Sequence, residues 1–318
     1  MGKKVLITGA SGFIGSFLCE KSIELGFGTW AAIRKTSSKR WLQHAELHFI
    51  TLDLTDKEAL KRQLKDSDTT FDVVIHAAGK TKCKDMDEFD FHNYQCTCHL
   101  VEALMETGMM PRQFIYLSSL SAEYGSAYGK SKLKTEQWLR NFFNQADSHL
   151  VIFRPTGVYG PREKDYFLMV KSIKQHVDFS VGFKPQLLTF VYVRDLVDAI
   201  FKAVESDIKE GTFSITDGEV YSSRTFSDLI QKELGVKHVV HITAPLWFLK
   251  VVCVVAEGFA HLTGTTSTLN RDKYKIMAQR DWTCDTEPMK TELGFRPQWQ
   301  LPRGVKETIA WYKKENWI

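Results

Sequence analysis

A tyrosine and a lysine stand four residues apart in the stretch 127–132 (AYGKSK), and together they could move a proton. Residues four apart on a helix share a face, so the phenol of Tyr128 and the ammonium of Lys132 would lie side by side. A phenol ordinarily ionises near pH 10, and a neighbouring cation favours the phenolate. The spacing therefore predicts a tyrosine with a lowered pKa, suited to proton transfer near neutral pH.

Hydroxyl side chains gather at the end of a predicted strand, 113–118, upstream of this pair. Ser118, Ser119 and Ser121 lie at or just beyond that strand's end. Ligands bind at the carboxyl ends of parallel strands, so these hydroxyls should face the same crevice as Tyr128. One of them could donate a hydrogen bond to a substrate carbonyl as negative charge develops on it. The others could equally cap the next helix.

A glycine-rich turn near the N-terminus predicts a dinucleotide site. The stretch 8–15 (TGASGFIG) follows a short apolar strand and opens a helix. Gly9 would permit the tight turn, Gly12 a close approach to a pyrophosphate, and Gly15 close packing of the helix on the sheet. The free N–H groups at the helix start would hold the anion. The residues expected to bind the cofactor here are Gly9, Ser11, Gly12, Phe13, Ile14 and Gly15.

The residues after the second predicted strand, 27–33, bear on which dinucleotide binds. An acidic residue there would bind the ribose hydroxyls of NAD. This chain instead has Arg34 and Lys35, followed by serines and further cations. A guanidinium and an ammonium suit a 2′-phosphate, so NADP(H) is favoured, with NAD(H) possible. The alternative interpretation is a solvated basic loop.

Alternating strands and helices must position these residues. The expected strands are 4–8, 27–33, 47–52, 72–76, 113–118 and 150–154, and the expected helices are 13–25, one starting at Asp56, 89–107 and 126–144. Parallel strands need crossovers of this length, so the pattern predicts a doubly wound, Rossmann-like α/β sheet with a smaller C-terminal substrate domain. The expected nucleotide-binding domain comprises 1–162 and 190–216, and the substrate domain 163–189 and 217–318.

The composition is typical of a globular protein. The 318 residues are 43% hydrophobic and 25% charged, which excludes a disordered, collagenous or small disulfide-rich chain. The net charge of +4 is too small to indicate nucleic-acid binding. The six cysteines form no C-x-x-C pair, so we expect no metal site and the reduced thiols of a cytoplasmic protein.

One apolar segment, 246–262, resembles a membrane segment but is interrupted by Lys250, Glu257 and His261. It is also shorter than the roughly 20 apolar residues that a spanning helix needs. We therefore expect no transmembrane segment. A buried or partner-facing helix is favoured over a helix that lies on a membrane surface.

Together these motifs resemble those of the extended short-chain dehydrogenase/reductase family, the NAD-dependent epimerase/dehydratase group, along nearly the whole chain. The motifs that carry the resemblance are TGASGFIG (8–15), LDLTD (52–56), HAAG (76–79), the segment around Asn93, YLSS (116–119), YGKSK (128–132), RPTGVYGP (154–161) and FVYVRDLVDAI (190–200).

The resemblance implies roles for single residues. Tyr128 would be the general acid/base, and Lys132 would hold the nicotinamide ribose and tune Tyr128. Ser119 would polarise the carbonyl, with Ser118 as the second choice, and Asn93 would support Lys132. Further implied cofactor contacts are Asp53 and Leu54 at the adenine, Ala77 and Ala78 along the cofactor, and Pro155 and Val158 beside the nicotinamide. A homodimer formed through the helices near 89–107 and 126–144 is also implied.

Two departures from the family pattern bear on the substrate. Nucleotide-sugar enzymes often carry an Asn before V-Y-G-P and an Arg before F-V-Y-V, and this chain has Thr156-Gly157 and Leu188 there. The pattern is similar to dihydroflavonol-reductase and hydroxysteroid-dehydrogenase members, whose substrates are less polar. We expect an NADP-dependent oxidoreductase acting on a carbonyl/alcohol pair of a fairly apolar or small molecule. The alternatives are a nucleotide-sugar epimerase or dehydratase with retained NAD and, third, a non-catalytic NADP-binding protein.

Overall fold

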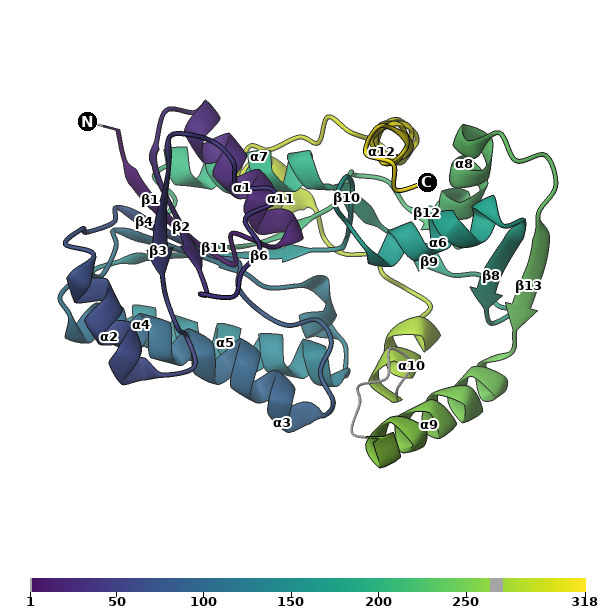
Figure 1. Cartoon of the computed structure of the whole chain (residues 1–318), viewed down its shortest axis with the longest axis horizontal. Helices are drawn as coiled ribbons and strands as arrows, with labels where there is room; N and C mark the ends of the chain where they lie inside the picture. The colour runs from purple at the N-terminus through teal and green to yellow at the C-terminus, as the bar shows by residue number, and fades with distance from the viewer. Residues whose placement is uncertain (1, 264–270) are drawn as a thin grey trace. The chain divides into compact units, whose positions relative to one another are not determined.

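The chain forms two compact units, each built from segments that are distant in sequence. The computed structural model describes residues 2–263 and 271–318 (Figure 1). The first unit comprises 1–154, 197–214 and 288–295, and the second comprises 155–196, 215–287 and 296–318.

A seven-stranded sheet forms the centre of the first unit, in the order β11-β6-β5-β4-β1-β2-β3. Its strands are β1 (Lys4–Thr8), β2 (Gly28–Ile33), β3 (Leu47–Thr51), β4 (Val73–His76), β5 (Gln113–Leu117), β6 (His149–Pro155) and β11 (Glu210–Ile215). Neighbouring strands from β3 to β6 run parallel. The chain winds outward in both directions from β1 and β4, which confirms the predicted doubly wound α/β fold.

Helices cover both faces of this sheet (Figure 1). They are α1 (Phe13–Glu24), α2 (Lys57–Asp66), α3 (Met86–Phe89), α4 (Cys96–Glu106), α5 (Ala127–Phe143) and α11 (Glu287–Thr291), together with the part of α7 (Val193–Glu205) from residue 197 onward. Leucines of α2, α4 and α5 share one core with the sheet; Leu60, Leu100 and Leu139 are fully buried in it. The central strands β1, β4 and β5 are buried on both faces, as continuous apolar runs predict.

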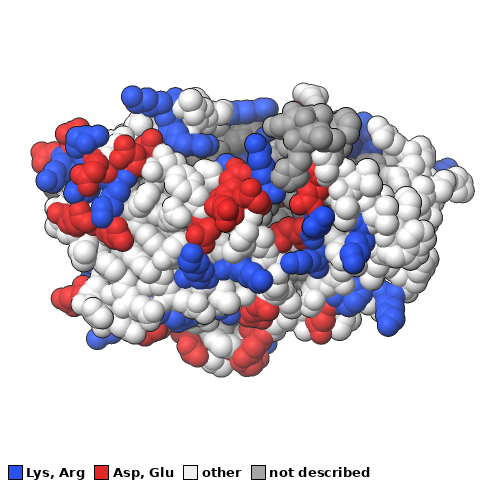
Figure 2. Space-filling model, turned by 90° about the horizontal axis from the view of Figure 1, so that it is seen from below, with Lys and Arg blue, Asp and Glu red and all other residues white. Residues whose placement is uncertain are grey.

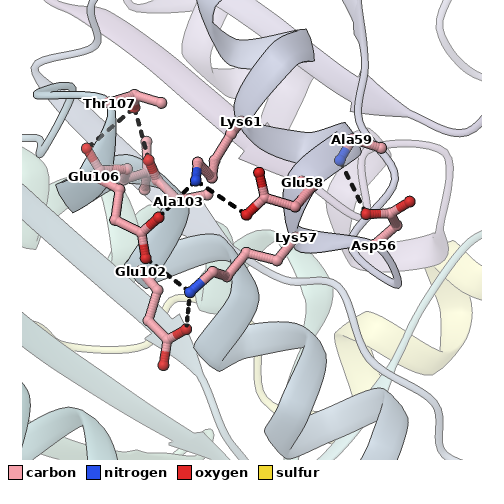
Figure 3. Close-up of polar contacts among 10 residues, drawn as sticks. Asp56, Lys57, Glu58, Ala59, Lys61, Glu102, Ala103, Glu106 and Thr107 are labelled. Atoms are coloured by element: carbon pink, nitrogen blue, oxygen red, sulfur yellow. Dashed lines mark hydrogen bonds and ion pairs between the residues drawn. The ribbon is translucent and has the colours of Figure 1, made fainter.

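An ion-pair network joins α2 to α4 (Figure 3). Asp56 caps α2 by accepting from the N–H of Ala59 at 2.9 Å, as the sequence predicts. Lys57 and Lys61 then lie 2.7 and 2.8 Å from the carboxylate of Glu106. These two lysines lower the pKa of Glu106 to about 2. Because these groups are in water, the network aligns the helices more than it stabilises the fold.

The expected helix over 89–107 differs in two respects. It begins at residue 86, in α3, and a π-helical turn, η1 (Asp90–Gln95), separates α3 from α4. A π-turn inserts one residue into the helical hydrogen-bond ladder and is often found at functional sites. It turns a different set of side chains toward the sheet than an unbroken helix would.

The second unit consists of short strand pairs and helices. Its strands are β7 (Gly157–Tyr159), β8 (Val177–Val181), β9 (Leu187–Leu188), β10 (Phe190–Tyr192), β12 (Tyr221–Ser222) and β13 (Val240–Ala244), paired as β10-β7, β12-β9 and β13-β8. Its helices are α6 (Asp165–Lys174), α8 (Thr225–Leu234), α9 (Leu246–Thr263), α10 (Arg271–Ala278) and α12 (Leu301–Lys314). Strand β13 is not among the strands expected from the sequence.

Aromatic side chains form much of the core of the second unit. Tyr159, Phe190 and Phe226 pack ring against ring, with centroids 4.9 to 6.3 Å apart. The fully buried carboxylate of Asp195 accepts hydrogen bonds from the N–H groups of Gln298 and Trp299, so it fixes the chain just before α12. Within the described residues, no helix is long and apolar enough to cross a membrane.

Candidate active site

The glycine turn lies where β1 and β4 neighbour each other, the point at which the strand order reverses. Gly9 has a φ of +68°, and a Cβ there would lie 2.8 Å from the backbone of Ala77 and of Ala78. A Cβ on Gly15 would overlap the carbonyl oxygen of Gly9. Both glycines are therefore required by the fold, because a side chain would separate the helix from the strands.

Gly12 differs from these two glycines. Its N–H donates to Gly9 at 2.9 Å, and a Cβ on it would meet a single atom within 4 Å, that same carbonyl oxygen at 3.1 Å. The next residues, Phe13 and Ile14, open α1, which has no side-chain cap and no acidic residue in its first turn. The start of α1 therefore offers N–H groups beside open space, which fits the pyrophosphate of a dinucleotide. Ser11 is half-buried in the same turn.

A chain of hydrogen bonds fixes the end of β4. The buried ring of His76 lies 2.7 Å from the hydroxyl of Thr8 and 2.9 Å from that of Thr97. Thr97 donates its own proton to the carbonyl of Asn93, so it must accept from Nε2–H of His76. His76 is then neutral, with Nδ1 accepting from Thr8. Burial and the charge of Lys132 lower its pKa to about 3.

The residues expected at the adenosine end lie at the ends of β2 and β3. Arg34 and Lys35 are exposed directly after β2. Hydrogen bonds from Thr55 lower the pKa of Asp53, and the charge of Arg34 lowers it further, so Asp53 and Arg34 are within electrostatic reach. Leu54 is half-buried and packs against the core of the sheet.

Lys80 adds a cation that the sequence analysis did not single out. It forms an ion pair with Glu88 at 2.9 Å. Burial is the largest cause of the lowered pKa of His92. The charges of Lys80 and Arg34 lower this pKa further, and the charge of Glu88 offsets part of the lowering. The cation that follows β2 (Arg34) and the cation that follows β4 (Lys80) therefore both act electrostatically on His92.

Asn93 lies in the π-turn and connects the β4 loop to α5. Its amide oxygen accepts from the N–H of Lys80 at 2.8 Å, and its amide nitrogen donates to the hydroxyl of Ser131 at 3.0 Å. A Cβ on Gly79 would lie 3.0 Å from this amide oxygen and 3.4 Å from the ammonium of Lys132. The π-turn thus brings Asn93 next to Lys132, and glycine at 79 leaves room for both.

Lys132 is buried and held by the end of β5. Its ammonium donates to the carbonyl of Leu117 at 2.8 Å and lies 4.8 Å from the ring centroid of Tyr116. Burial lowers the pKa of Lys132 to about 8, and the charge of Glu136 offsets part of that lowering. Lys132 therefore stays mostly charged at neutral pH.

Tyr128 is one turn before Lys132 on α5 and is half-buried. A hydrogen bond with the hydroxyl of Ser119 lowers its pKa, but burial outweighs this and raises the pKa to about 12. The predicted lowered pKa is therefore wrong for the protein by itself, because desolvation of the phenolate is the largest effect. The proximity of the two hydroxyls distinguishes Ser119 from Ser118.

Ser118 has a different partner. Its hydroxyl donates a short hydrogen bond to the buried carboxylate of Glu136. The same carboxylate accepts from Arg154 Nε at 3.0 Å and from a terminal nitrogen of Arg154 at 2.6 Å. Sequence reasoning missed Glu136, although its position four residues after Lys132 on α5 would have indicated a shared face. The hydroxyl of Ser119 accepts a hydrogen bond from the N–H of Ser121 and so caps η2 (Leu120–Glu123).

Two predicted cofactor contacts belong to the second unit. Pro155 is the last residue of β6, and Val158 lies in β7, opposite Val191 of β10. Their contact with a nicotinamide stays a prediction.

In the described part of the chain, no group of three or more His, Cys, Asp or Glu side chains could hold a metal ion. Burial raises the pKa of Cys96 and Cys98 to about 11 and 12.

A glycine turn at the reversal point of a parallel sheet, followed by Ser119, Tyr128 and Lys132 at the next strand end, defines a dinucleotide-dependent enzyme of the short-chain dehydrogenase/reductase type. The chain belongs to the NAD dependent epimerase/dehydratase family, whose model matches residues 5–216. The model of GDP-mannose 4,6 dehydratase matches residues 126–308. These matches confirm the family resemblance and the predicted enzyme class.

Curated relatives span the whole chain. A ceramide reductase of Caulobacter vibrioides is 24% identical, covering 99% of this chain and 96% of its own length. The human dTDP-D-glucose 4,6-dehydratase is 26% identical, covering 99% and 92%. The family thus includes both reductases and nucleotide-sugar enzymes among this chain's relatives.

Solved structures share the fold. UDP-glucose 4-epimerase from Thermotoga maritima, solved with UDP-glucose, matches with a TM-score of 0.79 and 22% identity, covering 98% of this chain and 99% of its own. WbmG of Bordetella bronchiseptica, solved with NAD and UDP, matches with a TM-score of 0.76 and 20% identity, covering 99% and 96%.

Proposed function

We propose that this enzyme transfers hydride between NADP(H) and the carbonyl or alcohol carbon of an apolar, lipid-like substrate, with Tyr128 as general acid/base. The single observation that carries the reaction is the hydrogen bond between Ser119 and Tyr128, one helical turn from the buried ammonium of Lys132. The bound cofactor supplies or accepts the hydride.

The residues of the chain perform the proton transfer. In the reductive direction Ser119 donates a hydrogen bond to the substrate carbonyl oxygen, and Tyr128 gives its phenolic proton to that oxygen as the alcohol forms. The charge of Lys132, held by the carbonyl of Leu117, then stabilises the phenolate left behind. A phenol whose pKa is about 12 before binding is fully protonated, as an acid must be.

The preference for NADP(H) rests on the end of β2. Arg34 and Lys35 present two exposed cations, and no carboxylate is among residues 34–40 to bind ribose hydroxyls. A guanidinium binds a phosphate in a bidentate manner, which suits the 2′-phosphate. In this proposal the remaining cofactor contacts come from the glycine turn, Asp53, Leu54, Ala77, Ala78, Pro155 and Val158.

The substrate class rests on the second unit. Leu188 stands where many nucleotide-sugar enzymes have an arginine, and it lies in β9, opposite Tyr221. The hydroxyl of Thr156 is bound within the unit, 2.6 Å from the carbonyl of Thr189. Neither residue supplies a charge for a diphosphate. The relative from Caulobacter vibrioides, a ceramide reductase, supports a long-chain substrate for this enzyme too.

The test is an activity assay with purified protein and NADPH or NADH. We expect reduction of a long-chain ketone of the ceramide type, faster with NADPH than with NADH. Tyr128→Phe should lower kcat by about 100-fold or more, because it removes the proton donor. NADPH affinity should change little in this variant. Arg34→Ser should weaken NADPH and leave NADH unchanged.

The second candidate is a nucleotide-sugar epimerase or dehydratase that retains NAD. The match of the GDP-mannose 4,6 dehydratase model to residues 126–308, which cover much of the second unit, favours it. Stoichiometric NAD in the purified protein, with turnover of a nucleotide sugar and none of the ketone, would replace the first proposal by the second.

The homodimer through α4 and α5 also remains a proposal. Light scattering of the purified protein would test it.

A further inference from the structure

Helix α9 of the second unit has apolar side chains on two opposite faces. Leu249 and Cys253, four residues apart, are buried. A second set of apolar side chains, three or four residues apart, is exposed to between 38% and 69%. This set comprises Trp247, Phe248, Val251, Val254 and Val255. The expectation of a buried or partner-facing helix thus holds for the Leu249 side, while the other face is open to solvent.

The end of β8 lies beside the start of α9 and adds one more exposed aromatic side chain. Gly182, directly after β8, donates its N–H to Ala244 at 2.8 Å, and a Cβ on it would lie 3.4 Å from the side chain of Leu246. The next residue, Phe183, is 76% exposed. Phe183 and the five exposed residues of α9 are called the α9 patch below.

The charges beside the α9 patch are positive. Lys184 follows Phe183 and Lys250 lies within α9, and both are exposed. Glu257 is the one acidic residue in 237–258, and it lies 3.4 Å from Arg271. Figure 2 faces α9, and the right-hand end of that view is mostly white, with more blue than red.

We propose that the α9 patch docks on the surface of a lipid bilayer that contains anionic lipids. Tryptophan and phenylalanine on one side of a helix, flanked by lysines, are typical of helices that lie in the plane of the interface. The lysine stems can follow the apolar surface while their ammonium groups meet lipid phosphates. No described helix spans a bilayer, so the contact is peripheral.

A second copy of the chain is a less favourable occupant of this face. A symmetric dimer would bring two copies of the same patch together, so the lysines of one copy, Lys184 and Lys250, would face a surface that carries the same two positive charges. Such like-charge contacts oppose association. Lipid phosphates complement the same two lysines.

The test is co-sedimentation with vesicles, so its outcome is independent of the proposed reaction. The vesicles consist of phosphatidylcholine alone or of phosphatidylcholine mixed with phosphatidylglycerol. We expect the protein to bind the mixed vesicles roughly tenfold more strongly or more, and added salt to weaken that binding. The variant Lys184→Gln/Lys250→Gln should bind both kinds of vesicle equally.

A second variant removes the apolar part of the contact. Trp247→Ser/Val251→Ser/Val255→Ser should lose binding to both kinds of vesicle, with an unchanged circular dichroism spectrum. Leu168→Ser is the matched control, because Leu168 is 61% exposed on α6, outside the α9 patch. This control should bind as the wild type does.

Three results would overturn the proposal. One is absence of vesicle binding by the wild type, and another is wild-type binding by the triple serine variant. The third is a dimer, seen by light scattering, that the triple variant loses while the wild type ignores vesicles. That result would assign the α9 patch to a second copy of the chain.

Discussion

The region around Glu136 in the first unit and the α9 patch in the second differ in what surrounds their side chains: protein partners in the first, water in the second. Glu136, Ser118 and Arg154 are linked by short hydrogen bonds, and the Glu136 carboxylate is almost fully removed from water. The α9 patch leaves six large apolar side chains in contact with water. A change around Glu136 should therefore reduce stability, whereas a change in the α9 patch should alter binding and leave stability intact.

The largest effect is expected at the glycine turn of the first unit. Gly15→Ala puts a methyl group onto the carbonyl oxygen of Gly9, so α1 must move away from β1. We expect a loss of about 3 kcal/mol or more, a large share of the roughly 5–15 kcal/mol that stabilises a typical domain. Gly12→Ala is the control: it should cost less than about 1 kcal/mol yet weaken cofactor binding at least tenfold. Urea unfolding and cofactor titration measure both. Equal stability of the two variants would contradict this account.

The next effect concerns the charge of Glu136. Glu136→Gln leaves Arg154 with only its ion pair to Glu123 at 3.0 Å and removes the charge that supports the pKa of Lys132. We expect a cost of about 3 kcal/mol in unfolding free energy. We also expect a Lys132 pKa below its value of about 8, seen as a shift of the pH–activity profile toward acid.

Glu123→Gln serves as the matched control, since its carboxylate is 39% exposed and pairs with the same arginine. It should cost less than about 1 kcal/mol and leave the pH profile in place. If both variants behave alike, the buried carboxylate of Glu136 has no special role.

A smaller, pH-dependent effect is expected at His76. Its pKa in the folded protein is about 3, below the ordinary value near 6.5, so only the unfolded chain takes up this proton as the pH falls. The contribution of the neutral His76 ring to the free energy of unfolding is therefore fully present above about pH 6.5. It is lost on acidification by up to about 1.4 kcal/mol per pH unit. Urea unfolding between pH 7 and 5 should show a steeper loss for the wild type than for His76→Asn, and parallel slopes would refute the neutral buried ring.

The smallest effect is expected on the open face of α9. Val255 is 65% exposed, so Val255→Ser should change the unfolding free energy by less than about 0.5 kcal/mol. Leu249 is 7% exposed on the opposite side of the same helix, and Leu249→Ala should cost about 2 kcal/mol or more. A large cost for Val255→Ser would mean that the α9 patch is covered within the protein itself.

Sequence reasoning was most successful for the first unit because its elements are locally encoded. Apolar runs marked the strands, Asp56 marked the start of α2, and the glycine spacing marked the turn between β1 and α1. It was less successful where a non-local effect dominates. The π-turn at Asn93 depends on hydrogen bonds to Lys80 and Ser131, which lie 13 and 38 residues away. Strand β13 forms because it pairs with β8, about 60 residues earlier.

The amino-acid sequence by itself determined the fold class, the family and the place of Tyr128 and Lys132 one turn apart on a helix, because spacing along a strand or helix is a local property. The tertiary structure decided what surrounds those residues. It distinguished the two serines by their hydrogen-bond partners, which are Glu136 for Ser118 and Tyr128 for Ser119. Burial in the folded chain also raises the pKa of the Tyr128 phenol instead of lowering it. The tertiary structure also showed which face of α9 stays in water. Burial and charge depend on neighbours that the folded chain brings together from distant positions, and spacing along the sequence carries no information about them.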